Sequence, residues 1–295
     1  MSQSNFKSGF VSIIGKPNVG KSTLMNGLVG DDLSITTSKA QTTRHRIMGI
    51  LSGDNYQIVY SDTPGLLDPQ YSLQKSMMSF VHSSLEDADI ILYVVELMQK
   101  HDEEELLEKL AESGRPVILV INKIDQNKGS RLKDKIDYWD LIYPSLEIIS
   151  VSALERDNLD QLLNRLVELL PIHPPYFPED TLTDKSERFF ASEIVREKIF
   201  ENYKQEVPYS SEVEVTSFVE EEKIIRIRAE IYVERKSQRV ILIGKGGESI
   251  KKVGTEARIE MEKFFNKKVF LETFVKVEQD WRKKDKLLKK FGYKN

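Results

Sequence analysis

The sequence contains no cysteine among its 295 residues. Disulfide bonds and thiolate metal sites are therefore excluded. No apolar run approaches the roughly 20 residues that a membrane-spanning helix needs. The first ten residues, MSQSNFKSGF, lack the charged and then apolar pattern of a secretory signal. Together these absences predict a protein of the reducing cytoplasm.

Charge is distributed unequally along the chain. The net charge is −4, but residues 1–180 carry 17 basic and 26 acidic side chains, whereas residues 181–295 carry 26 and 21. The length fits about two domains. An acidic first part and a basic second part predict two domains with different partners.

The first 170 residues alternate between strand-like and helix-like segments. Apolar runs of strand length lie at 10–15, 56–62, 89–96, 116–123 and 146–152. Helical patterns lie between them, at 21–29, 73–86, 102–113, 130–142 and 158–170. This alternation predicts an α/β domain with a mostly parallel sheet covered on both faces. Residues 46–52 would add an antiparallel edge strand.

The segment PIHPPYFPED, residues 171–180, contains four prolines and cannot continue a helix. We interpret it as a linker. The predicted domain limits are therefore 1–170 for the first domain, 171–180 for the linker, 181–278 for the second domain and 279–295 for a basic helix or tail.

A glycine-rich loop, GKPNVGKS, follows the first predicted strand and opens the first predicted helix. This is the context in which backbone N–H groups and a helix N-terminus bind phosphate. Lys21 would reach the β- and γ-phosphates and the Ser22 hydroxyl would bind Mg²⁺. The predicted phosphate-binding residues are Gly15, Lys16, Pro17, Asn18, Val19, Gly20, Lys21, Ser22 and Thr23.

The motif DTPG, residues 62–65, ends the next parallel strand, at the edge of the sheet where ligands bind. Asp62 would hold Mg²⁺ through a water molecule, and the Gly65 amide would meet the γ-phosphate. Thr63 and Pro64 complete this part of the predicted site.

Two further motifs, NKID at 122–125 and SAL at 152–154, end the following two strands. The Asp125 carboxylate can accept two N–H donors from a guanine edge, which adenine does not offer. The predicted base-binding residues are Asn122, Lys123, Asp125, Ser152, Ala153 and Leu154.

Together, in this order, these motifs resemble those of the P-loop GTPases. The resemblance makes TTSKAQTTRHR, residues 36–46, the first switch, in which a threonine binds Mg²⁺ when the γ-phosphate is present. We choose Thr43 for this role and keep its neighbour Thr42 as the alternative. With Lys21, Asp62 and Gly65, Thr43 completes the predicted catalytic set. Many GTPases place a glutamine after the DxxG glycine to orient water, but this chain has Leu66.

The second domain has the predicted order α-β-β-α-β, with a second glycine loop, IGKGG, entering its last helix. The apolar run VILI before this loop is interpreted as strand-like and as part of a groove for bases. The order resembles the KH module, an α+β fold whose G-x-x-G loop grips the backbone of about four nucleotides. The predicted RNA-binding residues are Ile243, Gly244, Lys245, Gly246, Gly247, Lys251, Lys252 and Arg258.

A GTPase domain with KAQTTRHR in its first switch, followed by a KH domain with IGKGG, resembles the Era family. The resemblance implies a cytoplasmic bacterial or organellar GTPase that binds single-stranded RNA near the 3′ end of small-subunit rRNA, and we expect a monomer. It also implies a role in 30S maturation and loose association with the membrane. The alternative is a GTPase whose second domain binds a protein or a membrane instead of RNA.

Two features stay open at this stage. Asn18 resembles the asparagine of GTPases that use K⁺ beside the phosphates, or it only shapes the loop. The basic tail DWRKKDKLLKKFGYKN contacts RNA phosphates, contacts a membrane surface, or is a solvated face.

Overall fold

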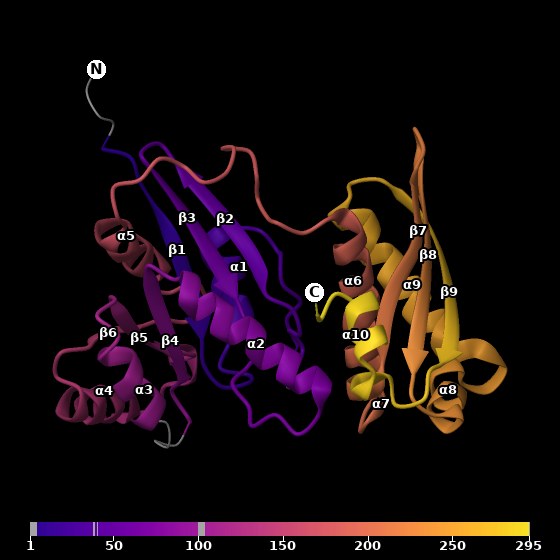
Figure 1. The fold of residues 1–295 in the computed structure, drawn as a ribbon, viewed down its shortest axis with the longest axis horizontal. Helices are drawn as coiled ribbons and strands as arrows, with labels where there is room; N and C mark the ends of the chain where they lie inside the picture. Colours follow the sequence, from indigo (N-terminus) through magenta and orange to yellow (C-terminus); the bar gives the residue numbers. More distant parts are fainter. Residues whose placement is uncertain (1–4, 38, 40, 100–103, 295) are drawn as a thin grey trace. The chain divides into compact units, whose positions relative to one another are not determined.

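The computed structural model describes residues 5–37, 39, 41–99 and 104–294. The start of the expected helix 102–113 and positions 38 and 40 of the first switch lie outside the described residues. The chain divides into two compact units (Figure 1). The first unit comprises Met1–Ser34, Thr43–Asp68 and Met77–Asp184, and the second comprises Ile35–Thr42, Pro69–Ser76 and Lys185–Asn295.

A six-stranded sheet forms the centre of the first unit, in the order β2-β3-β1-β4-β5-β6. Its strands are β1 Lys7–Ile14, β2 Ile47–Gly53, β3 Tyr56–Asp62, β4 Ile90–Glu96, β5 Val117–Asn122 and β6 Glu147–Ser150. Every pairing is parallel except that of β2 with β3. The predicted mostly parallel sheet with one antiparallel edge strand is confirmed.

The helices of the first unit are α1 Lys21–Val29, α2 Ser72–Asp87, α3 Glu104–Ala111, α4 Arg131–Ile142 and α5 Leu159–Leu169, with α2 beginning in the segment grouped with the second unit. After β1 the chain forms β2 and β3 on one side of that strand. It then crosses over β1 and forms β4, β5 and β6 on its other side. Because such crossovers are right-handed, this reversal puts helices on both faces and opens a crevice at the carboxyl ends of β1 and β4. All six residues of β5 are buried, as expected for a strand covered on both sides.

The proline-rich segment 171–180 packs against the first unit. The Pro171 carbonyl accepts a hydrogen bond from the Ser8 amide at 3.1 Å. Gln57 donates to the Phe177 carbonyl at 2.9 Å through its side-chain amide. The contacts continue beyond the prolines, so the first unit extends to Asp184.

The second unit is built on a three-stranded sheet in the order β7-β8-β9. Its strands are β7 Glu212–Glu220, β8 Ile224–Val233 and β9 Lys268–Val277, and its longer helices are α6 Glu187–Asn202, α8 Lys236–Ile243 and α9 Glu248–Phe264. Shorter helical segments are α7 Val207–Ser210, η3 Trp281–Lys283 and α10 Asp285–Lys290. The core of this unit joins apolar residues of α6, α9 and the sheet, as in an α+β domain.

The run VILI, residues 240–243, is helical, so its interpretation as strand-like was wrong. It forms the second half of α8. Gln238 Oε1 accepts hydrogen bonds from the amides of Glu234 and Arg235, at 3.0 and 2.9 Å, which stabilises the first turn of this helix. Four apolar residues fit a strand and a half-buried helix equally well, because so short a run shows no period.

Among the described residues, no helix is both long enough and apolar enough to cross a membrane.

Candidate nucleotide site and nucleic-acid loop

The first glycine loop links β1 to α1. Lys21 is 6% exposed, and its ammonium group lies over the loop, donating to the carbonyls of Gly15 and Lys16 at 3.1 and 2.9 Å. The Leu66 amide donates to the Gly15 carbonyl at 3.0 Å, which joins the segment after DTPG to the same loop. The structure therefore brings the phosphate-loop lysine and the DTPG motif together.

Gly20 is a position where only glycine fits. Its φ is 94°, and a Cβ atom there would lie 2.3 Å from Asn122 Nδ2. Asn122 needs this space because its Nδ2 donates to the Val19 carbonyl at 2.9 Å. The phosphate loop is thereby joined to the end of β5.

Three oxygen-bearing side chains meet beside the loop. Ser22 Oγ donates to Asp62 Oδ2 at 2.7 Å and lies 2.8 Å from Thr43 Oγ1. Thr43 Oγ1 also donates to Asp62 Oδ2, at 3.3 Å. The adjacent Thr42 is engaged elsewhere, since its hydroxyl donates to the Lys39 carbonyl at 2.7 Å. Of the two candidate threonines, Thr43 lies with Ser22 and Asp62.

Asp62 is completely buried. Burial raises the pKa of its carboxyl group, while the hydrogen bond from Ser22 and the charge of Lys21 lower it. Its Oδ1 is a buried atom with no hydrogen-bond partner in the part of the chain that the structure describes. A buried carboxylate oxygen next to two hydroxyls is a donor set that suits Mg²⁺, which prefers oxygen ligands.

The residues predicted to bind the base meet at the ends of β5 and β6. Asn122 Oδ1 accepts hydrogen bonds from the amides of Lys123 and Ala153, at 2.7 and 2.9 Å. Ser152 Oγ donates to Asp125 Oδ1 at 2.6 Å and so orients the carboxylate. Leu154, the last residue of the SAL motif, is exposed. The structure thus brings NKID and SAL together.

Glu96 is a residue of this site that sequence reasoning missed. Its carboxylate forms an ion pair with Lys123, whose ammonium also donates to the Asn18 carbonyl at 2.6 Å. The position of Glu96 in the sequence could have indicated this role, because it ends β4 at the same sheet edge as the other motifs. Glu96 thus helps to hold Lys123 across the phosphate loop.

The second glycine loop joins α8 to α9. Gly244, Gly246 and Gly247 all have positive φ angles, of 73°, 61° and 82°. A Cβ atom at Gly246 would meet no described atom within 4 Å, so this backbone is open to a ligand. Lys245 is exposed beside it.

The basic side chains of α9 differ in whether they form ion pairs with carboxylates. Lys251 is exposed, and among the described residues no ion pair involves it. Lys252 lies 3.7 Å from Glu256, and Arg258 is held by Glu262 at 2.9 Å. The structure therefore presents Lys245 and Lys251 as free charges, while Arg258 already has a carboxylate partner.

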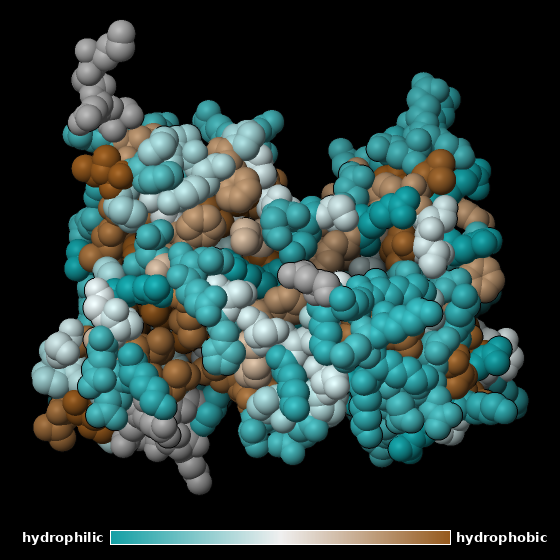
Figure 2. Space-filling view, viewed as in Figure 1, coloured by the Kyte–Doolittle hydropathy of each residue, from teal (hydrophilic) through white to brown (hydrophobic). Residues whose placement is uncertain are grey.

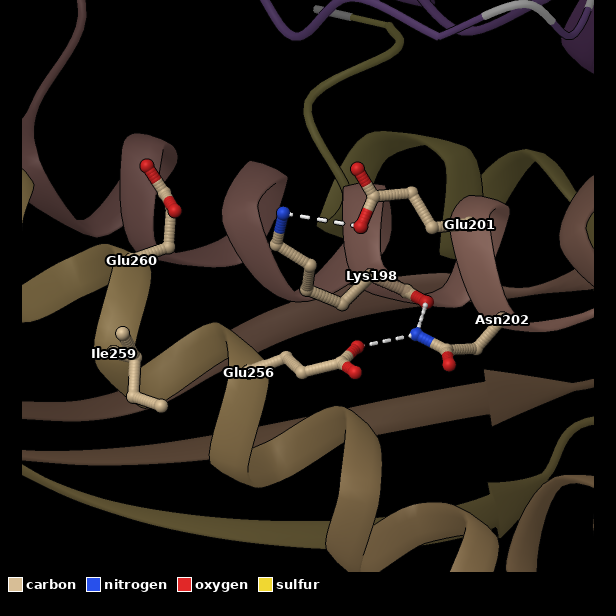
Figure 3. A pocket seen from close by; sticks show the side chains of 6 residues that line it. All are labelled: Lys198, Glu201, Asn202, Glu256, Ile259 and Glu260. Carbon is tan, nitrogen blue, oxygen red and sulfur yellow. Dashed lines mark hydrogen bonds and ion pairs between the residues drawn. The ribbon is translucent and has the colours of Figure 1, made fainter.

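A groove of about 330 Å³ lies between α6 and α9 (Figure 3). It is lined by Lys198, Glu201, Asn202, Glu256, Ile259 and Glu260. Glu256 accepts a hydrogen bond from Asn202 Nδ2 at 2.6 Å, and Lys198 pairs with Glu201 at 3.1 Å. Its three carboxylates would repel phosphate, so this groove is not part of the candidate nucleic-acid surface.

Comparison with protein families agrees with the division of the chain into a nucleotide-binding part and a second, separate domain. A model described as 50S ribosome-binding GTPase matches residues 10–123, and a model described as KH domain matches residues 206–282. The fold and the site define a P-loop GTPase joined to a KH domain.

The curated relatives cover nearly the whole chain. GTPase Era of Syntrophus aciditrophicus is 47% identical over 98% of this chain and 95% of its own length. GTPase Era of Geobacter metallireducens is 46% identical over 99% of this chain and all of its own length. The chain belongs to the Era family of GTPases, as the sequence predicted.

Two solved structures of the family share the fold. One is a crystal structure of Era in complex with MgGDPNP and nucleotides 1506–1542 of 16S ribosomal RNA; it has a TM-score of 0.94 and 40% identity, and the match covers 98% of this chain and 100% of that chain. Another, a variant of Aquifex aeolicus Era bound to GDP and AlF4⁻, has a TM-score of 0.94 and 39% identity with the same coverage.

Proposed function

We propose that this protein hydrolyses GTP in its first unit, binds the 3′ region of small-subunit rRNA with its second, and assists 30S subunit maturation. The observation that carries the proposal is the match, over 98% of this chain, to a solved structure of Era in complex with MgGDPNP and nucleotides 1506–1542 of 16S ribosomal RNA. In this chain the GTPase motifs are hydrogen-bonded to one another in the first unit, and the second glycine loop is exposed in the second unit. Both observations support GTP binding by the first unit and RNA binding by the second.

Mg²⁺ would be held by Ser22 and Thr43 directly and by Asp62 through water. It would neutralise charge that develops on the β- and γ-phosphates. The short distances among the three side chains, 2.7 to 3.3 Å, support this assignment. Lys21 would add a second positive charge at the same phosphates, and the Gly65 amide would donate to the γ-phosphate.

Hydrolysis would proceed without a glutamine that orients water. Leu66 follows Gly65 and has no hydrogen-bonding side chain, so water would be positioned by backbone groups of the switches. We infer that K⁺, held by Asn18 and the first-switch backbone, supplies a fixed charge comparable to an arginine finger. The alternative, in which Asn18 only shapes the loop, predicts no preference for K⁺.

RNA would be gripped through its backbone by the loop Gly244–Gly247. Open space around Gly246 supports close approach of a phosphate, and Lys245 supplies the neighbouring charge. Lys251 extends the positive surface along α9, two helical turns before Arg258.

The test is a double replacement, Lys245→Asp with Gly246→Asp, in the full chain. Aspartate tolerates the positive φ at position 246 better than most residues, so the fold should survive. We expect affinity for the rRNA 3′ segment to fall by about tenfold or more because aspartates repel phosphate. GTP affinity should stay within about twofold.

The chain offers a matched control. Lys128 and Gly129 have the same two residue types, and Gly129 also has a positive φ, of 70°, with no described atom near its Cβ position. Replacing both with aspartate makes the same charge change in the first unit. Equal RNA binding by the two double variants would remove the glycine loop from the proposal. Stronger binding to a protein or to lipid vesicles than to RNA would favour the alternative function.

The cellular location follows from the proposed partner. Binding to small-subunit rRNA would require a location in the cytoplasm, and membrane association and the monomeric state are further predictions.

A further inference from the structure

The C-terminal segment 281–294 is fixed to the second unit. Trp281 and Leu288 are fully buried, and Tyr293 is 2% exposed. Trp281 Nε1 donates to the Ser210 carbonyl at 2.8 Å. This segment is therefore an ordered surface of the unit and not a loose tail.

The segment is strongly basic, with seven basic side chains and one acidic. Three of the basic side chains pair with carboxylates: Arg282 with Glu234, Lys290 with Glu214 and Lys294 with Asp285. The other four, Lys283, Lys284, Lys286 and Lys289, are exposed, and no ion pair within the described residues involves them. We call these four residues the lysine patch.

All four lysines of the patch are exposed, two of them on α10, with Lys283 at the end of η3 and Lys284 between the two helical segments. Lys286 and Lys289 are three residues apart and lie on one side of the helix, whereas Leu288 faces the core of the unit. Figure 2 shows a hydrophilic surface over this helix. The patch thus concentrates four like charges in one short ordered segment, and a bound polyanion would offset their mutual repulsion.

We propose that the lysine patch is a second RNA contact, separate from the glycine loop, which binds phosphates without reading bases. The proposal rests on RNA binding by the second unit. Lysine ammonium groups act as mobile point charges, which suits contact with a sugar-phosphate backbone of any sequence.

The position of the patch indicates which RNA it would take. The C-terminal segment contacts Ser210 and, in β7, Glu214, whereas α8, which leads into the glycine loop, packs against β9 at the opposite edge of the sheet. A KH loop grips about four nucleotides. The patch would therefore hold RNA that continues beyond the nucleotides in the glycine loop.

An RNA partner fits this surface better than a membrane. The aromatic and aliphatic residues of the segment are buried or half-buried in the unit, with Trp281 and Leu288 at 0% exposure. Stable membrane binding needs an inserted apolar group in addition to positive charge. The exposed part of the segment offers charge alone.

The experiment replaces all four lysines of the patch with glutamine in the full chain and measures binding to two RNAs. One is a single strand of about 30 nucleotides and the other has about five, enough for the glycine loop alone. For the long RNA, the slope of log K against log salt should fall by up to about 3, since each phosphate contact to a single strand contributes about 0.7. The affinity should fall roughly 10- to 100-fold at physiological salt.

The short RNA and a control variant complete the test. Binding of the short RNA should change by less than about twofold. The control replaces Lys128, Lys133, Lys223 and Lys263, which are exposed elsewhere, with glutamine, so the net charge changes equally. An unchanged salt slope in the patch variant, or an equal loss in the control, would overturn the inference.

Two further outcomes separate the proposals. If the glycine-loop variant binds both RNAs like the wild type, the glycine loop is removed from the proposed function, whatever the patch variant shows. If the patch variant keeps its RNA affinity but loses binding to vesicles of anionic phosphatidylglycerol, the patch is a membrane contact and the RNA inference is wrong.

Discussion

Replacing Asp125 with asparagine changes the group predicted to recognise guanine. Ser152 Oγ holds Asp125 Oδ1 at 2.6 Å, so the carboxylate has a defined orientation. A guanine edge would donate two N–H groups to it. Asparagine removes the charge and turns one acceptor into a donor, which then faces the donors of the base.

The expected loss follows from those two bonds. A hydrogen bond to a charged group contributes about 1.5–3 kcal/mol, so losing both costs about 3–6 kcal/mol. GTP affinity should fall by roughly 10²- to 10⁴-fold. Xanthosine triphosphate should bind better than it does to the wild type, because xanthine has a carbonyl where guanine has its amine.

Competition against a fluorescent guanine nucleotide measures both affinities. Asp134→Asn is a matched control, since Asp134 also accepts a hydrogen bond from a serine, Ser130, at 2.8 Å in the same unit. That control should bind both nucleotides like the wild type. A D125N variant that binds GTP within about threefold of wild type, and shows no gain for xanthosine triphosphate, would refute the assignment.

Two other changes test the same site. Glu96→Gln removes the ion pair that holds Lys123, and because both side chains are about 30% exposed the rate of GDP release should rise only about two- to fivefold. A kcat that stays unchanged would agree with a positioning role, whereas no change in GDP release would contradict it. Asn18→Ala should abolish the faster hydrolysis expected in K⁺ over Na⁺ at equal ionic strength; equal wild-type rates in the two salts would rule out the cation mechanism.

The sequence predicts the first unit well because its signals are local. Each nucleotide motif ends a strand, and parallel strands place their carboxyl ends at one edge. That rule alone brings Asp62, Asn122 and Ser152 to the same side of the sheet. The first switch has no periodic pattern, so the sequence does not show which of its threonines faces the Mg²⁺ site. The choice between Thr42 and Thr43 required the distances to Ser22 and Asp62.

The missed features depend on contacts that the residue pattern does not show. Glu96 and Lys123 are 27 residues apart, and no local pattern links them. The helical state of residues 240–243 depends on a turn that Gln238 stabilises upstream. In the C-terminal segment, composition shows the charge, but only the burial of Trp281 shows that the lysines are held on an ordered surface.

The two glycine loops use glycine for different physical reasons. At Gly20 the protein itself fills the space, since Asn122 Nδ2 would lie 2.3 Å from an added Cβ atom. A larger residue there would push Asn122 away from the Val19 carbonyl and so disturb phosphate loop and base pocket together. At Gly246 nothing described lies within 4 Å, and the φ of 61° is the only internal constraint. The space there is free for a partner, so an alanine at position 246 would meet no clash, and its cost of about 1–2 kcal/mol would come from the positive φ alone.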